Sequence, residues 1–199
     1  MVKRKKKKVR AELLLRRVLS ISLLVLLLLW GVGQTSLFQK IVYPYPHRFT
    51  VEKYAELYGM DPLLVVAVMR EESRFLPYSE SSQGAVGLMQ LMPDTARAIA
   101  AGLGDENYED GDLLLPEKNI QYGTWYLESL RKEFDNTVLI LAAYNGGRGQ
   151  VREWINSNQI NLARLRQQDI PFPETRHYVE KVLKSYQMYT KLYSSDYSL

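Results

Sequence analysis

The chain has 199 residues, of which 46% are apolar and 24% are charged, and it contains 12 glycines and 8 prolines. These proportions suit one folded domain with a sizeable core, and they exclude a disordered, fibrous or low-complexity protein. The absence of cysteine excludes disulfide scaffolds, thiolate zinc sites, a cysteine nucleophile and a lipid-modified N-terminal cysteine.

The net charge of +4 is concentrated at the N-terminus. Residues 1–17 contain nine lysines and arginines and a single acid, Glu12, for a local charge of +8, so the rest of the chain carries −4. A net acidic domain has no general electrostatic attraction for a phosphate backbone. Nucleic acid is therefore not an expected partner, and the basic segment needs another explanation.

An uncharged, leucine-rich run follows the basic segment at residues 18–33. As a helix it reaches roughly 24 Å, short of the roughly 30 Å hydrocarbon core of a membrane, and extension to Phe38 makes up the difference. Basic residues stay on the cytoplasmic side of a membrane. We therefore expect a cytoplasmic tail at 1–17, one transmembrane helix at 18–38, and an extracytoplasmic remainder.

The alternative to an uncleaved anchor is a signal peptide whose basic and apolar regions are removed after export. The length of the apolar run favours the anchor, because the pair Gly31 and Gly33 is only a weak cleavage-like signal. A buried core helix is disfavoured, since leucines surround the helix on every side next to nine basic residues. Both remaining interpretations place the domain outside the cytoplasm.

Residues 39–49 are predicted to be an extended, semi-rigid stalk because of their Tyr-Pro-Tyr-Pro sequence. In the domain that follows, residues 50–199, Thr50 is predicted to cap a first helix, and Asp61-Pro62 to begin a second helix that is apolar on almost every face. The predicted helices cover residues 51–58, 62–73, 93–101, 117–134, 137–144, 148–156 and 173–193. Short strand pieces are expected only between residues 76 and 90, so the domain is predicted to be mainly α.

Two adjacent glutamates, Glu71 and Glu72, end the second helix. A carboxyl at the edge of an apolar core resists ionisation, so its pKa rises and it can donate a proton near neutral pH. The alternative is a solvated pair at a helix end, where negative charge opposes the helix dipole. Helix periodicity does not choose between the two glutamates.

Two later segments carry polar groups out of apolar surroundings. Within residues 79–93, Met89 and Gln90 can lay a thioether and an amide along a groove, although a methionine packed in the core is the simpler interpretation. A later apolar helix ends in Tyr144 and Asn145 before two glycines. A plain helix C-cap is the simpler interpretation there.

These segments extend into four ordered motifs. They are Glu72-Ser73 with Phe75 and Pro77, Gly87-Leu88-Met89-Gln90 with Met92-Pro93, Ala143-Tyr144-Asn145, and Ile170-Pro171 followed by Glu174-Thr175-Arg176-His177-Tyr178-Val179. In this order and spacing they resemble the catalytic domain of the soluble-lytic-transglycosylase (SLT) family, a branch of the lysozyme-like superfamily. The resemblance covers Phe49 to Tyr189, which is nearly the whole domain.

The resemblance implies a lysozyme-like helical fold and cleavage of the β-1,4 bond between N-acetylmuramic acid and N-acetylglucosamine in peptidoglycan. It implies that the glutamate directly before serine, Glu72, is catalytic, and it gives no role to Glu71 or His177. It further implies a glycan-binding set around the catalytic carboxyl: Ser73, Met89, Gln90, Tyr144 and Asn145, with Tyr178 close to the carboxyl.

An ordinary glycosidase needs two carboxyls, and no convincing second one is found. Glu80 lies in a serine-rich loop, and Asp94 looks like a first-turn helix acid. A lytic transglycosylase manages with one: Glu72 protonates the leaving oxygen, the substrate's 2-acetamido group stabilises the positive centre, and Glu72 then accepts a proton from the attacking 6-hydroxyl. The resemblance thus implies a 1,6-anhydro product and no cofactor.

Two other functions are consistent with the same motifs. A hydrolytic muramidase on this fold would need a second groove carboxylate and would release ordinary reducing ends. A non-catalytic glycan-binding module would not need Glu72. The favoured interpretation has peptidoglycan strands as substrate and places the enzyme in a bacterial cell membrane as a single-pass protein, or outside the cell after signal cleavage.

The acidic stretch at residues 105–112 raises the question of calcium. Aligned with an EF-hand loop, it places Tyr108 at a ligand position, so the match fails. The chain has only two histidines, which makes a histidine metal site improbable. We expect a solvated loop before the helix at Pro116 and no metal.

Overall fold

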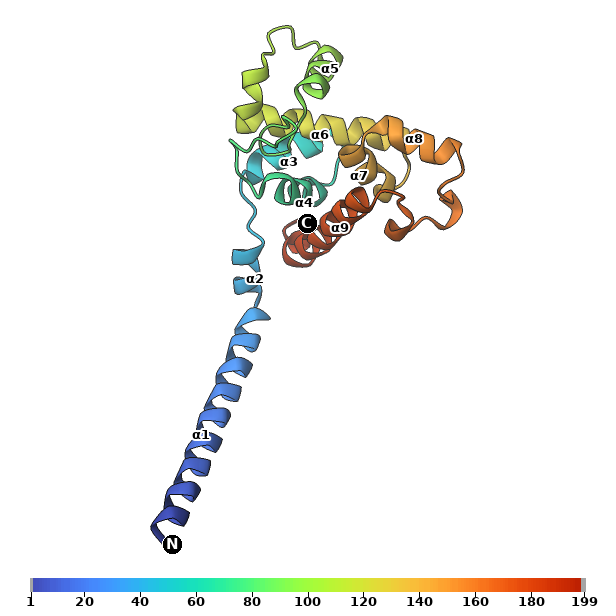
Figure 1. The fold of residues 1–199 in the computed structure, drawn as a ribbon. Helices are drawn as coiled ribbons and strands as arrows, with labels where there is room; N and C mark the ends of the chain where they lie inside the picture. The colour runs from blue at the N-terminus through green and yellow to red at the C-terminus, as the bar shows by residue number, and fades with distance from the viewer. Residues whose placement is uncertain (1, 198–199) are drawn as a thin grey trace. The chain divides into compact units, whose positions relative to one another are not determined.

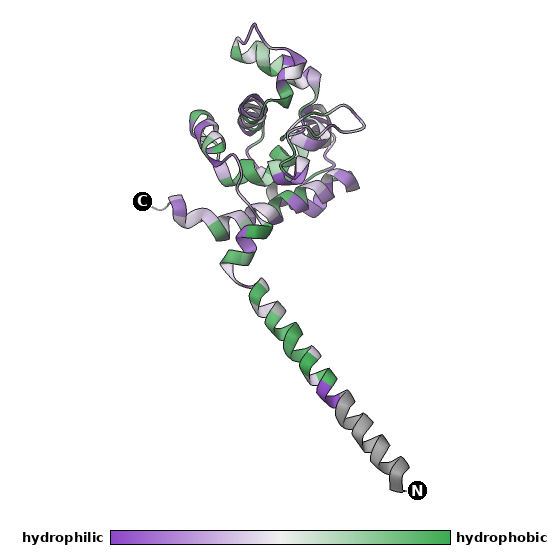
Figure 2. Ribbon diagram, turned by 90° about the vertical axis from the view of Figure 1, so that its left-hand side faces the viewer, coloured by the Kyte–Doolittle hydropathy of each residue, from purple (hydrophilic) through white to green (hydrophobic). Residues whose placement is uncertain are grey.

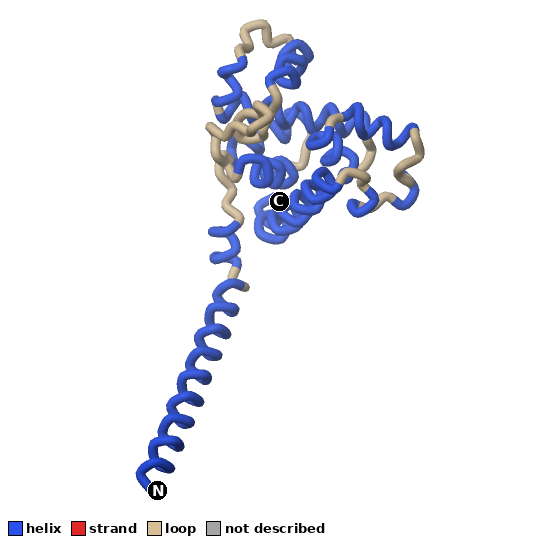
Figure 3. The backbone as a smooth tube through the Cα atoms, viewed as in Figure 1, coloured by secondary structure: helices blue, strands red, loops and turns tan. Residues whose placement is uncertain are grey.

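The computed structural model describes residues 2–197, and at residues 2–15, 29 and 163 it describes the backbone alone. Met1, where the predicted tail begins, and residues 198–199, where the predicted domain ends, lie outside this description. The chain divides into two compact units, one up to Pro44 and one from Tyr45 onward. Within the described residues every regular element is a helix (Figure 3).

The first unit contains α1 (Val2–Gly33) and α2 (Ser36–Val42). Within α1, Arg16–Gly33 is long and apolar enough to cross a membrane (Figure 2). Signal sequences and membrane anchors are both rich in leucine, so this stretch is compatible with either. The Thr35 side chain accepts a hydrogen bond from the backbone N–H of Phe38 and caps α2. A new helix therefore begins at this point, and α1 does not continue to Phe38.

The second unit contains the other seven α-helices of the described chain. They are α3 (Arg48–Tyr58), α4 (Pro62–Ser73), α5 (Pro93–Leu103), α6 (Pro116–Glu133), α7 (Thr137–Gly146), α8 (Arg148–Asn156) and α9 (Pro173–Tyr193). Short 3-10 helices lie at Asp110–Leu114, Leu162–Arg164, Gln167–Asp169 and Ser194–Tyr197. The prediction of a mainly helical domain is confirmed, and α8 and α9 begin and end at the predicted residues.

Helix α4 forms the centre of this unit. Asp61 caps it by accepting a hydrogen bond from Leu63 N at 2.8 Å, and Pro62 occupies the first turn. Residues 63–69 are all buried, and each large apolar side chain among them contributes roughly 1.5–3 kcal/mol to the folded state. Figure 1 shows α9 beside α4, and α9 also contacts α7.

Helix α3 begins earlier than the sequence predicts. Thr50, expected to cap it, lies inside the helix, and the residue before the helix is His47, which has a left-handed backbone (φ 53°) and no side-chain cap. Arg48 instead pairs with Glu52 and Asp196, each at 2.7 Å. The contact with Asp196, near the other end of the domain, therefore fixes the start of α3. Residues 45–49, the last part of the predicted stalk, belong to the second compact unit.

The segment between α4 and α5 does not form the expected strand pieces. Its backbone makes two isolated antiparallel bridges, Glu80 with Val86 and Val86 with Leu91. Such bridges fold the segment back on itself without building a sheet. The segment therefore returns toward the end of α4, which places the second motif next to the first.

The acidic stretch is more ordered than the predicted solvated loop. Asp105 accepts hydrogen bonds from Lys118 at 2.5 Å and from the Tyr122 hydroxyl at 2.6 Å, and these contacts lower its pKa. Asp110 pairs with Arg97 at 2.5 Å. Among the described residues no cluster of three or more histidine, aspartate or glutamate side chains is arranged to hold a metal ion.

Candidate active site

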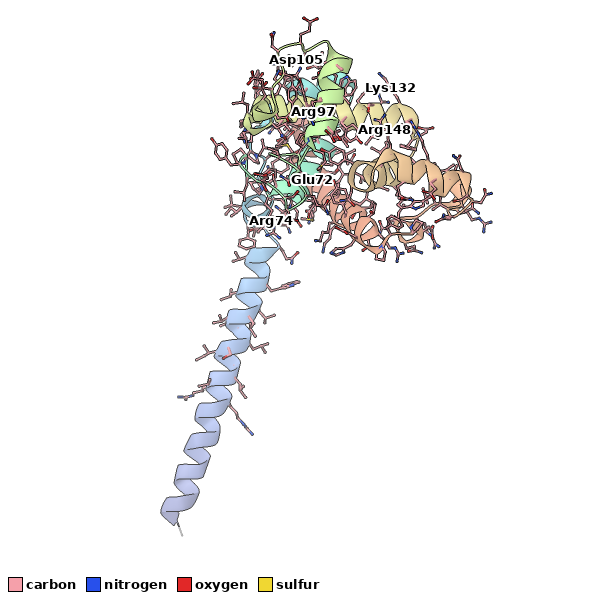
Figure 4. The ribbon with its side chains drawn as sticks, turned by 45° about the horizontal axis from the view of Figure 1, so that its top comes forward. Glu72, Arg74, Arg97, Asp105, Lys132 and Arg148 are labelled. Carbon is pink, nitrogen blue, oxygen red and sulfur yellow. The ribbon has the colours of Figure 1, made fainter. Side chains whose placement is uncertain are left out.

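Glu72 lies in the last turn of α4, directly before a sharp change of chain direction (Figure 4). The two residues that make the turn, Arg74 and Phe75, have left-handed backbones with φ of 51° and 66°. This conformation is unfavourable for residues with a Cβ, and it is often found near functional sites. The turn ends the helix with the Glu72 carboxyl at the edge of the core.

The Glu72 carboxyl is half-buried, and its pKa is raised to about 7. The largest cause is burial, which removes the charged form from water. The Tyr178 hydroxyl approaches the carboxyl and lowers its pKa, while the charge of Glu71 raises it further. A carboxyl with this pKa is partly protonated at neutral pH and can both give and take a proton.

Two tyrosines from other helices face this carboxyl. Tyr144, from α7, and Tyr178, from α9, both have pKa values raised well above the ordinary range, first by burial and then by the charge of Glu72. The Tyr144 hydroxyl donates a hydrogen bond to the backbone oxygen of Met89 at 2.7 Å. The Tyr178 hydroxyl is buried without a completed hydrogen bond among the described residues. It therefore lies where it can donate to the Glu72 carboxylate.

Ser73 joins the end of α4 to the second motif. It is 5% exposed, and its hydroxyl donates to the backbone oxygen of Leu88 at 2.7 Å and accepts from Phe75 N at 3.1 Å. These bonds hold the loop and the left-handed turn against the end of α4. The contact between Ser73 and a glycan remains a prediction.

Met89 and Gln90 hold the same loop in shape. The Met89 side chain is fully buried against α6, where a Cβ on Gly123 would come within 2.3 Å of its sulfur. Gln90 has φ of 47°, and its amide donates to the backbone oxygens of Ser79 at 3.0 Å and Gly87 at 2.9 Å. Their contacts with substrate also remain predictions.

The remaining predicted residue, Asn145, follows Tyr144 at the end of α7. It is exposed, so its amide is accessible to a ligand without any change in the fold. Ser73 and Tyr144 thus both contact the backbone of the second motif, which carries Met89 and Gln90. Tyr178 lies beside Glu72. Asn145 stands at the edge of this group.

Asn119 is an important site residue that the sequence analysis misses. This fully buried side chain on α6 accepts from Met89 N at 2.7 Å and donates to the backbone oxygens of Val86 at 3.0 Å and Leu113 at 2.9 Å. A Cβ on Gly87 would lie 2.2 Å from its nitrogen. In the sequence, Asn119 is a lone amide next to Ile120 on an otherwise buried face of the helix. A buried amide needs hydrogen-bond partners, so this position could have indicated a structural role.

Comparison with known proteins identifies relatives of this domain. The sequence profile of the family described as Transglycosylase SLT domain matches residues 49–166, more than half of the chain. "Soluble lytic murein transglycosylase" of Escherichia coli K12 is 34% identical over 157 residues, which cover 77% of this chain and 24% of that protein. "Membrane-bound lytic murein transglycosylase C" of Actinobacillus pleuropneumoniae is 32% identical over 161 residues, which cover 70% of this chain and 44% of that protein.

Solved structures agree with this assignment. Lytic transglycosylase Slt from Pseudomonas aeruginosa, solved as an inactive mutant, superposes with a TM-score of 0.68 at 36% identity over 76% of this chain and 25% of that one. The 70 kDa soluble lytic transglycosylase of E. coli gives 0.70 at 34% identity over 77% and 25%. The chain thus spans about a quarter of the length of these larger relatives. With its four motifs gathered around Glu72, the chain belongs to the Transglycosylase SLT domain family.

Proposed function

We propose that this chain is a lytic transglycosylase that cleaves the β-1,4 bond between N-acetylmuramic acid and N-acetylglucosamine in peptidoglycan. The observation that carries the proposal is the half-buried carboxyl of Glu72, whose pKa is about 7 and which two half-buried tyrosines face. Support comes also from the relatives, which are named lytic murein transglycosylases. No cofactor takes part in the proposed reaction.

In the first half of the proposed reaction, protonated Glu72 acts as a general acid. It gives its proton to the glycosidic oxygen while the bond from that oxygen to C1 of N-acetylmuramic acid breaks. Positive charge develops at C1, and the neighbouring 2-acetamido oxygen of the substrate stabilises it. Glu72 is left as a carboxylate, to which the Tyr178 hydroxyl can then donate a hydrogen bond.

In the second half Glu72 acts as a base. Its carboxylate takes the proton of the 6-hydroxyl of the same sugar while that oxygen forms a bond to C1, which gives a 1,6-anhydro ring and restores the acid. Water is not consumed, and intramolecular attack supplies a high effective concentration of the nucleophile. One carboxyl therefore suffices, in contrast to glycosidases that need two.

The other predicted residues divide into two groups in this proposal. Tyr144, Asn145 and Gln90 carry polar groups at or near the surface of the site and line the glycan groove. Ser73 and Met89 are buried, and they serve the groove by holding the loop in place. Because these contacts fix the loop next to Glu72, the carboxyl keeps the same position in both halves of the reaction.

Mass spectrometry of released muropeptides tests the proposal. The detergent-solubilised full chain is incubated with purified peptidoglycan beside Glu72→Gln and, as a matched control, Glu80→Gln in an exposed part of the nearby loop. The expected products are lighter by one water than hydrolytic muropeptides, present with Glu80→Gln and absent with Glu72→Gln. Full-mass reducing products would identify a muramidase, and no release from any of the proteins would favour a binding module.

We propose further that α1 remains as a membrane anchor, with residues 1–17 cytoplasmic and the domain outside. The apolar stretch Arg16–Gly33 supports this, together with the basic residues before it. The alternative is a cleaved signal sequence. The intact mass of the mature protein decides: a mass that includes residues 1–33 supports the anchor, and loss of these residues contradicts it.

A further inference from the structure

Helix α2 exposes large apolar side chains directly after the stretch that could cross a membrane (Figure 1). Leu37 is 75% exposed and Ile41 is 70% exposed, and none of the residues of α2 is buried. Neither the proposed reaction nor the proposed anchor gives this helix a role. Its exposed apolar surface therefore needs a partner that is not part of the described chain.

The apolar side chains of α2 share one side of the helix. At about 100° per residue, the four apolar residues fall within an arc of roughly 140°, and the three polar residues occupy the opposite side. The apolar residues are Leu37, Phe38, Ile41 and Val42, and the polar residues are Ser36, Gln39 and Lys40 (Figure 2). A helix with this separation suits a boundary between an apolar and an aqueous phase.

The junction between α1 and α2 is built from polar groups. The Thr35 hydroxyl donates to the backbone oxygen of Val32 at 2.7 Å and accepts from Phe38 N at 3.3 Å. The Gln39 amide donates to the backbone oxygen of Gly33 at 3.4 Å. An exposed hydroxyl and a break in the helix are unfavourable within hydrocarbon. If α1 spans a membrane, the hydrocarbon core therefore ends near Gly33, and α2 follows at the outer surface.

Aromatic residues stand on both sides of α2 in the sequence. Trp30 lies near the end of α1 and is 69% exposed, and Tyr43 directly follows α2. Tryptophan and tyrosine are enriched where a membrane meets water, because one end of each side chain is apolar and the other is polar. These residue types support the same depth for α2 as the polar junction does.

We propose that α2 is an interfacial helix whose apolar face lies in the outer leaflet of the membrane, among the phospholipid acyl chains just below the headgroups. The proposal rests on the proposed anchor, because α1 brings α2 to that surface. Lipid is the partner that the position of α2 favours, since only the junction at residues 34–35 separates it from the membrane-crossing stretch.

An α2 bound in this way holds the domain close to the membrane. The second unit begins at Tyr45, and from Val42 to Tyr45 the chain spans at most about 11 Å. The polar side of α2 then faces water. The interfacial helix would thus set the height of the domain above the lipid, and α1 would serve only to cross the membrane.

Quenching of a site-specific fluorophore tests the proposal. The chain contains no cysteine, so a single label can be attached to the full chain at Ile41→Cys, with Lys40→Cys as the matched control on the polar side; both positions are exposed. The protein is reconstituted in vesicles of phosphatidylethanolamine and phosphatidylglycerol. A nitroxide on the upper acyl chain of a lipid is expected to quench the Ile41 label several-fold more than the Lys40 label, and iodide in the water the reverse. Labels at Leu37→Cys and Ser36→Cys should repeat this contrast.

Three outcomes would overturn the interfacial helix. Equal quenching of the Ile41 and Lys40 labels by iodide would place both sides of α2 in water. Equal quenching of the two labels by the lipid nitroxide would mean that α2 has no preferred side in the membrane. Protection of the Ile41 label from both quenchers would mean that the domain or a second copy of the chain covers the apolar face.

A label at Leu26→Cys, within the apolar stretch of α1, separates this inference from the anchor. If lipid quenches the Leu26 label but not the Ile41 label, the anchor stands and the interfacial helix fails. If lipid quenches the Ile41 label while iodide reaches the Leu26 label, the anchor fails and α2 binds the surface by itself. None of these measurements depends on cleavage of peptidoglycan, so they do not share the fate of the proposed reaction.

Discussion

The carboxyl of Glu72 ionises near pH 7 in the folded protein, well above the value of about 4.3 for an exposed glutamate. The folded state therefore holds this proton at pH values where the unfolded chain has lost it. By linkage, the contribution of this group to stability is full at pH 4, falls as pH rises from about 4.5 to 7, and is constant above that. The same burial that makes Glu72 an acid makes its charged form destabilising.

Glu72→Gln mimics the protonated side chain and removes this penalty. We expect the variant to be more stable than the wild type by up to roughly 3 kcal/mol at pH 8 and equal to it at pH 4. Denaturant unfolding at the two pH values measures the difference. The exposed Glu80→Gln variant should show no such pH dependence, and a Glu72→Gln variant no more stable at pH 8 would contradict the burial of this carboxyl.

Glu71 tunes its neighbour through charge. It is held in place by a hydrogen bond from Ser185 at 2.5 Å and a contact with Arg70 at 3.6 Å, and its charge raises the pKa of Glu72. Glu71→Gln removes that charge, so the pKa of Glu72 falls and less of it is protonated at alkaline pH. We expect the alkaline limb of the pH profile of kcat/KM to move to lower pH.

In the proposed mechanism the protonated form of Glu72 starts the reaction, so Glu71→Gln should cost activity at pH 8, by about threefold, and little at pH 5. Initial rates on purified peptidoglycan across this range provide the measurement. A loss of the same size at both pH values would point to a structural role of Glu71 through Ser185, and an unchanged profile would mean that its charge does not reach Glu72.

At the level of elements, α6 supports the loop that carries Met89 and Gln90. Asn119 bonds to the loop backbone, and Gly123, one helical turn later, makes room for the Met89 side chain. Asn119→Leu leaves Met89 N and two carbonyl oxygens buried without this partner, which costs roughly 2–4 kcal/mol. Thermal unfolding should show the loss, and kcat on peptidoglycan should fall below the wild-type value even where the variant is fully folded.

Asn156→Leu is the matched control, because this asparagine is exposed at the end of α8. It should leave both the melting temperature and kcat near the wild-type values. If Asn119→Leu were as stable and active as this control, the hydrogen bonds of Asn119 would not be needed to position the loop.

Local patterns predicted most of the helices but not the contacts between them. The start of α8 follows from Gly147 directly before it, and the start of α4 follows from Asp61 and Pro62. The role of Asn119 depends on Met89, 30 positions away, and the start of α3 depends on a pair with Asp196, 148 positions from Arg48. Neither partner can be read from a local window, so these two features appear only in the folded chain.

For the catalytic site, the resemblance selected Glu72 where periodicity could not choose. Its surroundings could not be predicted in the same way. The burial of Ser73 and Met89 depends on how the loop packs against α4 and α6, and their contacts with the glycan remain predictions.

At the scale of the whole molecule, a short segment connects the two units. The second unit begins at Tyr45, whose ring packs against Tyr189 and Tyr193 near the end of the domain. Between α1 and Tyr45 lie residues 34–44, of which Ser36–Val42 is helical. Even fully extended, these residues span at most about 40 Å. If α1 is an anchor, the domain therefore begins within that distance of the membrane surface.

This tether predicts that an anchored enzyme cleaves only glycan near the membrane. Full chain reconstituted in lipid vesicles should release little from large insoluble peptidoglycan particles, and a flexible 30-residue Gly/Ser insertion after Val42 should increase release several-fold, because it lengthens the reach. In detergent, on soluble strands, the two proteins should have equal rates, which shows that the insertion leaves the active site intact. Equal release by both proteins from vesicles would mean that the tether does not limit where the enzyme acts.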